Sequence, residues 1–257
     1  MRADTRIPGC LEMEEEKMRR SKILILALLG LTCPLPLLAG SSLEAPAKGR
    51  LKVAFVMTEG ATMIDFAGPW EVFQDVHVPE RGSKMEEQMP FELFTIGQAK
   101  TPIQTSGGMA VVPDFSFADA PRADIIVVGA QRGAPGLDEF LQKAHARNTV
   151  VMSVCTGAFK LAKAGLLEGK PATTHHMFYD AFAEQYPKVE LERSKRYVQS
   201  DSHTFTAGGL TSGIDLALHI VALYFGDETA ERTAQYMEYQ SSGWRSEDVT
   251  TASTKAK

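Results

Sequence analysis

Short apolar runs recur along the chain and predict strands. Residues 51–57, 125–128 and 150–154 are nearly continuous apolar runs, and residues 91–96 form a fourth β-prone stretch. A strand with one solvated face would alternate apolar and polar residues. Continuous runs are instead typical of strands that are buried on both faces of a parallel sheet.

Segments with apolar residues at helical spacing separate these runs and predict helices. The expected helices are 64–75, 137–147, 158–164, 214–225 and 228–238, and Ser106-Gly107-Gly108 predicts a hairpin over 101–112. Strands that alternate with helices indicate an α/β protein, a three-layer α/β/α sandwich with a mostly parallel sheet. Ligands bind beyond the C-terminal strand ends of such sheets, so the loops 58–64, 129–136 and 155–157 are of most interest.

The composition fits a folded, mildly acidic protein. The chain has 257 residues, of which 44% are hydrophobic, and its formal net charge is −5. This apolar fraction excludes wholesale disorder. The acidic balance argues against a nucleic-acid partner, which would favour a basic patch. We expect one domain over 51–240, preceded by a polar linker at 42–50 and followed by a polar tail at 241–257.

The first 41 residues are typical of a secretory signal peptide. A basic stretch at 18–22 precedes an almost purely apolar stretch at 23–31, and small residues lie at 39–41. Acidic residues at 12 and 14–16 do not suit a basic leader, so we expect translation to begin at Met18. A membrane anchor is the alternative, but the apolar stretch is short for a span. We therefore expect an exported protein, periplasmic or secreted, with no stable membrane anchor after cleavage.

Cys155 is the first candidate for chemistry. Loss of residues 1–41 removes Cys10 and Cys33 and leaves Cys155 alone, which excludes an internal disulfide. A buried strand runs directly into Cys155, and Thr156 and Gly157 follow it before a helix. This order is typical of a nucleophile elbow. A helix N-terminus favours the thiolate, so we expect the thiol pKa to be lowered. An inert core cysteine is the alternative.

A thiol nucleophile needs a proton partner, and Asp65 is the best candidate. It follows the first strand among apolar neighbours, which should raise the pKa of its carboxyl. The alternative is that Asp65 caps the helix that it precedes. His175 and His176 also lie near, but adjacent side chains on an extended segment point to opposite faces, so at most one should reach the site. No second His or Cys cluster suggests a metal site.

These residues lie in segments that resemble the ThiJ/PfpI superfamily, which has a class I glutamine-amidotransferase-like fold. The matching segments are 65–69, 153–158, 164–170, 172–175, 207–218 and 237–239, in order along almost the whole mature chain. Related regulators carry similar segments. An aspartate at position 65, where the superfamily more widely has glutamate, favours the isonitrile hydratase-like branch.

The resemblance implies a cofactor-independent hydro-lyase that converts a small isocyanide to an N-substituted formamide. It implies that Cys155 is the nucleophile, Thr156 its hydroxyl neighbour and Asp65 the acid and base. It also implies a homodimer. Residues expected to bind substrate or stabilise an oxyanion are Gly129, Ala130, Gly157, His175 and His176. The sequence departs from the family where a Gly-Gly pair is frequent, at 129–132, and where tryptophan is common, at His176.

Three other functions stay open. A glyoxalase- or deglycase-like enzyme for reactive carbonyls would use the same thiol and a nearby histidine. A receptor domain of a transcription regulator would resemble this domain, but such regulators continue into a DNA-binding region, and the residues after Tyr239 are too short for one. A non-catalytic redox or ligand-binding protein needs only a reactive thiol.

Overall fold

A computed structural model of the protein describes residues 43–245. The chain divides into two units, residues 1–40 and 41–257, and the described residues all belong to the second. The expected leader and the end of the expected polar tail therefore lie outside the described residues. Among the helices that are described, none is long and apolar enough to cross a membrane.

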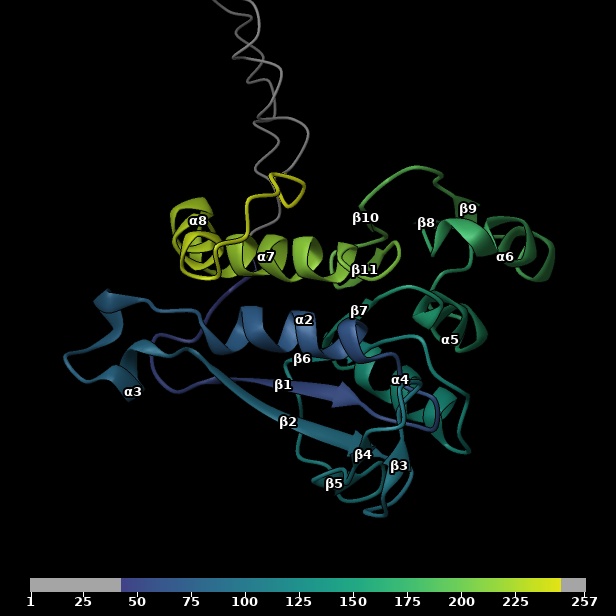
Figure 1. The fold of residues 1–257 in the computed structure, drawn as a ribbon, viewed down its shortest axis with the longest axis horizontal. Helices are drawn as coiled ribbons and strands as arrows, with labels where there is room; N and C mark the ends of the chain where they lie inside the picture. Colours follow the sequence, from purple (N-terminus) through teal and green to yellow (C-terminus); the bar gives the residue numbers. More distant parts are fainter. Residues whose placement is uncertain (1–42, 246–257) are drawn as a thin grey trace, which may run out of the picture. The chain divides into compact units, whose positions relative to one another are not determined.

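A seven-stranded, mostly parallel sheet forms the centre of the second unit (Figure 1). Its order is β10-β11-β7-β6-β1-β2-β5, and each pair is parallel except β10 with β11. The strands are β1 (Leu51–Val56), β2 (Phe91–Gly97), β5 (Phe115–Ser116), β6 (Ile125–Val128), β7 (Val150–Ser153), β10 (Tyr197–Gln199) and β11 (Thr204–Ala207). The four strands predicted from the apolar runs are confirmed.

Helices cover both faces of this sheet. The first face packs against α2 (Met63–Gln74), α7 (Ser212–Phe225) and α8 (Asp227–Tyr236), and the second against α4 (Leu137–His145), α5 (Gly157–Lys163) and α6 (Tyr179–Gln185). Along β1, Val53 and Phe55 join the first core, whereas Ala54 and Val56 join the second. Burial on both faces explains the continuous apolar run, and the predicted α/β/α sandwich is confirmed.

Smaller elements complete the unit. The predicted hairpin is present as β3 (Ile103–Gln104) and β4 (Ala110–Val111). Further short elements are η1 (Pro79–Arg81), α3 (Met85–Gln88), η2 (His176–Phe178) and the parallel pair β8 (Pro171–Ala172) and β9 (Glu190–Leu191). The apolar pattern did not predict β8 to β11 or α6, because most of these segments are short and rich in polar residues.

Contacts at both ends extend the domain beyond its expected limits. In the expected linker, the backbone N–H of Leu43 donates to the carbonyl of Leu223 at 3.0 Å, so this segment packs on α7. In the expected tail, Trp244 is only 2% exposed and its carbonyl accepts from the Tyr197 hydroxyl at 2.9 Å. The packed unit therefore continues past residue 240.

Candidate active site

The C-terminal ends of β1, β6, β7 and β11 meet at one edge of the sheet, because these strands are parallel neighbours. The segments that follow them bring together four parts of the chain. These are Asp65 on α2, the loop that starts at Gly129, the elbow at Cys155 and the loop that starts at Gly208. This edge is where the fold predicts a ligand.

Cys155 occupies a strained backbone conformation at this edge. Its φ is +58°, a region that side chains other than those of glycine rarely adopt. Hydrogen bonds on both sides hold it: its N–H donates to the Gly208 carbonyl at 2.8 Å, and its carbonyl accepts from Thr174 Oγ1 at 2.9 Å. A Cβ at Gly157 would lie 2.0 Å from the Val128 carbonyl oxygen, so glycine is required two residues later. The predicted elbow is confirmed.

Asp65 lies in the first turn of α2, and its side chain points across the site instead of capping its helix. The helix begins at Met63, and no side chain of the described residues caps it. Asp65 is fully buried, and its Oδ2 accepts from the Ala130 N–H at 2.9 Å. Its Oδ1 has no hydrogen-bond partner at bonding distance among the described residues. The capping alternative is therefore wrong, and one carboxylate oxygen is left to exchange a proton.

The thiol and the carboxyl shift each other's pKa. Burial raises the pKa of Asp65 to about 6, against opposing contributions from the Ala130 N–H and the Cys155 thiol. This confirms the raised pKa that its apolar neighbours predicted. Burial also raises the pKa of Cys155 to about 11, and the negative charge of Asp65 adds to that rise.

The expected lowering of the thiol pKa is therefore wrong. The backbone N–H groups of Thr156 and Leu210 do favour the thiolate, but burial outweighs them. Near neutral pH the site holds a protonated thiol beside an ionised carboxylate. Asp65 is thus placed to take the thiol proton when the sulfur attacks, as a general base does.

The other predicted residues have distinct places in the site. The Ala130 N–H is engaged by Asp65, and a Cβ at Gly129 would lie 2.8 Å from Asp65 Cβ, so this loop holds the carboxyl. The Gly157 N–H donates to the Val154 carbonyl at 3.0 Å.

The amides that face the sulfur are those of Thr156 and Leu210. Sequence reasoning missed Leu210, because a backbone donor leaves no residue-type signal. The matching segment 207–218 was the only indication of its importance.

The two histidines do not point to opposite faces. Their rings stack with centroids 4.5 Å apart, because His175 caps the turn η2, which begins at His176, and its Nδ1 accepts from the Met177 N–H at 3.2 Å. A Cβ at Gly209 would lie 2.1 Å from His175 Cδ2, so the His175 ring lies against the loop that carries Leu210. Burial and the neighbouring His176 lower the pKa of His175. His175 is therefore neutral at pH 7.

A cavity of about 400 Å³ adjoins the elbow. Its lining residues are Gly133, Thr156, Phe159, Lys160, Lys163, Phe178, Gln185 and Tyr186. We call it the elbow cavity. Its volume is in the range of small-molecule sites. Within residues 43–245, no group of three or more His, Cys, Asp or Glu side chains is arranged to hold a metal ion.

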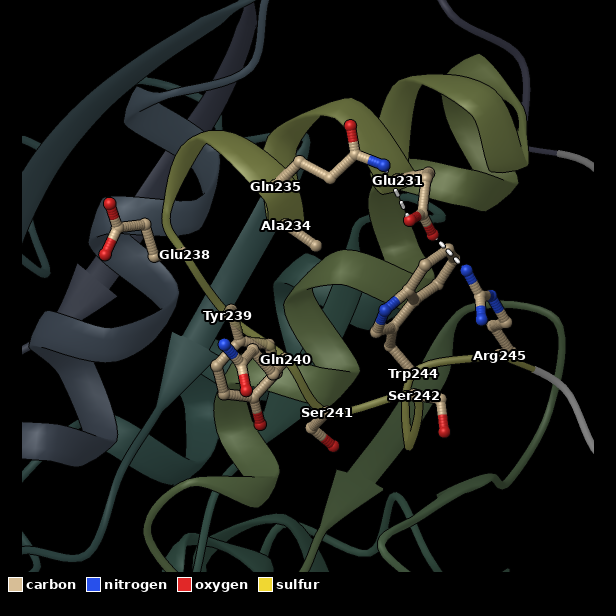
Figure 2. Close-up of a pocket in the computed structure, with 10 residues that line it drawn as sticks. All are labelled: Glu231, Ala234, Gln235, Glu238, Tyr239, Gln240, Ser241, Ser242, Trp244 and Arg245. Atoms are coloured by element: carbon tan, nitrogen blue, oxygen red, sulfur yellow. Dashed lines mark hydrogen bonds and ion pairs between the residues drawn. The ribbon is translucent and has the colours of Figure 1, made fainter.

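A second cavity, of about 480 Å³, lies between α8 and the segment that follows it (Figure 2). Figure 2 shows Glu231 between two partners, Gln235 and Arg245, beside the ring of Trp244. None of the predicted site residues lines this cavity. The elbow cavity is therefore the better candidate for the ligand of Cys155.

The chain is similar in sequence to an enzyme and to transcriptional regulators. Isonitrile hydratase of Pseudomonas putida is 30% identical over 195 residues, which are 74% of this chain and 78% of that enzyme. The HTH-type transcriptional regulator GbdR of Pseudomonas aeruginosa is 25% identical over 193 residues, or 73% of this chain. The chain spans only 50% of the length of that regulator.

Solved structures show the same fold. A ThiJ/PfpI family protein from Pseudomonas syringae is 26% identical with a TM-score of 0.62, covering 77% of this chain and 78% of that one. DJ-1beta of Drosophila melanogaster is 17% identical with a TM-score of 0.58, covering 74% and 98%, and shares the fold. Residues 51–223 match the DJ-1/PfpI family, and the chain belongs to that family.

Proposed function

We propose that this protein is a cofactor-independent enzyme that adds water to an isocyanide and releases an N-substituted formamide. The observation that carries the proposal is the buried pair of Cys155 and Asp65, a thiol beside a carboxyl with a pKa of about 6. Such a carboxyl can accept and return a proton near neutral pH. The 30% identity with an isonitrile hydratase supports this choice of substrate class.

The first half of the reaction uses both groups. The sulfur of Cys155 attacks the terminal carbon of R–N≡C, and the thiol proton passes to Asp65 as the S–C bond forms. Asp65 then gives this proton to the same carbon. The product is a thioimidate, R–N=CH–S–Cys155. The strained elbow holds the sulfur at the sheet edge in one position, which reduces the entropy lost on the way to the transition state.

The second half restores the enzyme. A water oxygen adds to the thioimidate carbon while Asp65 takes a proton from that water, and Asp65 then passes this proton to the nitrogen. The C–S bond of R–NH–CH(OH)–S–Cys155 then breaks, and the hydroxyl proton returns to the sulfur by way of Asp65. R–N≡C and water have become R–NH–CHO. The N–H groups of Thr156 and Leu210 stabilise negative charge on the departing sulfur.

A pair of assays tests the proposal. Purified protein is supplied with cyclohexyl isocyanide, and N-cyclohexylformamide is measured; in parallel it is supplied with methylglyoxal, and lactate is measured. We expect formamide and no lactate. Lactate without formamide would show a carbonyl-detoxifying enzyme instead, in which the neutral His175 would assist the thiol.

A second candidate function is ligand sensing without turnover. The match to GbdR favours it, because the matched part is half of a transcriptional regulator. Binding of an isocyanide or formamide without product formation, measured by calorimetry on the same protein, would support this candidate over the enzyme.

A further inference from the structure

The elbow cavity combines an aromatic wall with a lysine side chain. Phe159 lies edge-on to Phe178 and to Tyr186, with ring centroids 6.5 Å and 6.0 Å apart. The Tyr186 hydroxyl donates to the Phe159 carbonyl at 3.2 Å and fixes one side of this wall. Phe178 is 43% exposed, so apolar surface is open to an occupant. Flat apolar groups pack well against such rings.

Lys160 supplies a cation. It is partly buried, and among the described residues no hydrogen bond or ion pair engages its ammonium group. Its neighbour Lys163, by contrast, pairs with Asp138 at 2.6 Å. Burial and the charge of Lys163 lower the pKa of Lys160 against an opposing contribution from Asp138, so its charge is only partly compensated. Within the described part of the chain, no carboxylate lines the cavity. An anion in the cavity would compensate this charge.

The cavity is placed to receive the part of the substrate that does not react. Cys155 and Asp65 are not among its lining residues, but their neighbours are: Thr156 is bonded directly to Cys155, and Gly133 comes from the same loop as Ala130, whose N–H donates to Asp65. A substrate whose isocyanide carbon contacts the Cys155 sulfur would extend its substituent past Thr156 toward Phe159 and Lys160.

We infer that the elbow cavity is the substituent site and that it selects isocyanides with a flat apolar group ending in a carboxylate. This inference rests on the proposed function. Phe159, Phe178 and Tyr186 contact the apolar part, and Lys160 pairs with the carboxylate. The substrate class is therefore an anionic aryl or cyclic isocyanide rather than a neutral one.

The test compares phenyl isocyanide with 4-isocyanobenzoate. The wild-type protein should have the higher kcat/KM for the carboxylate, and Lys160→Met should reduce that preference by about 10- to 100-fold, the range for a hydrogen bond to a charged group. Lys160→Arg should keep most of it. Lys143→Met is the matched control, because Lys143 is an exposed lysine near the end of α4, outside the cavity. An equal preference in wild type and Lys160→Met would overturn the inference.

A binding measurement separates this inference from the reaction itself. Cys155→Ser protein, with and without Lys160→Met, is titrated with the product 4-formamidobenzoate and with neutral formanilide. We expect Lys160→Met to weaken binding of 4-formamidobenzoate alone, by about 10- to 100-fold. If neither isocyanide is hydrated but Lys160→Met weakens binding of 4-formamidobenzoate alone, the proposed hydration is wrong and the anion site is supported. If both isocyanides are hydrated and Lys160→Met does not change binding of 4-formamidobenzoate, the proposed hydration is supported and the anion site is wrong.

Discussion

Replacement of Asp65 by asparagine should stabilise the protein in a pH-dependent way while it removes activity. Burial raises the pKa of this carboxyl from 3.8 to about 6. A difference of about 2 units corresponds to about 3 kcal/mol at about 1.4 kcal/mol per unit. Because the folded state holds the proton more tightly than the unfolded state, the stability from this group is present below pH 4 and is lost as pH rises through 6.

An asparagine side chain cannot ionise, so Asp65→Asn should avoid this loss. The free energy of unfolding is measured by urea denaturation for both proteins at pH 4 and pH 7.5. The difference in free energy of unfolding between Asp65→Asn and wild type should grow by about 2 kcal/mol from pH 4 to pH 7.5. It is less than the full value of about 3 kcal/mol because the wild type has already lost part of this stability at pH 4. Asparagine can still accept the Ala130 N–H. Parallel pH dependences in the two proteins would refute the assigned burial cost of the carboxylate.

Three further predictions concern the same edge of the sheet. The kcat/KM for an isocyanide should fall about tenfold per pH unit below pH 6, the approximate pKa of Asp65, because Asp65 must be ionised to accept the thiol proton. A flat pH–rate profile from pH 5 to 7 would exclude that role. Cys155 of the wild type should react slowly with iodoacetamide at pH 7. At pH 8 to 9 it should react faster in Asp65→Asn than in wild type, because the variant has no carboxylate to raise the thiol pKa. Identical rates in the two proteins would contradict the coupling between Asp65 and Cys155. Gly157→Ala should destabilise the protein by about 3 kcal/mol or more, because its Cβ would meet the Val128 carbonyl, whereas Gly107→Ala, with open space, should change little in the same denaturation assay.

The sequence predicted those parts of the fold that are apolar on both sides. β1, β6 and β7 are fully covered by helices, so their residues are nearly all apolar. β11 is just as buried, but it contains Thr204 and Thr206, and Thr206 Oγ1 accepts from the Thr173 N–H at 2.9 Å. A buried hydroxyl with a hydrogen-bond partner breaks the apolar pattern without leaving the core.

The site was predictable where it depends on residue type and order along the chain. The step from strand to Cys155 to Gly157 specified the elbow, and apolar neighbours specified the raised pKa of Asp65. The direction of the thiol pKa shift was wrong, because the sequence does not show how deeply Cys155 is buried; burial raises this pKa most, and the charge of Asp65 adds to the rise. Leu210 was missed because it acts through its backbone, and a strand-like geometry was wrongly assumed for the histidine pair.

The central claim is that the Cys155 sulfur carries out the hydration, and substitution of that one atom tests it most directly. The rate of N-cyclohexylformamide formation from cyclohexyl isocyanide is measured for wild type and Cys155→Ser at pH 7.5, with circular dichroism to check folding. We expect turnover by wild type and loss of at least about 10³-fold in Cys155→Ser, because a serine hydroxyl is a far weaker nucleophile beside a carboxylate base. A folded Cys155→Ser protein that forms formamide at a rate within tenfold of wild type would contradict the account.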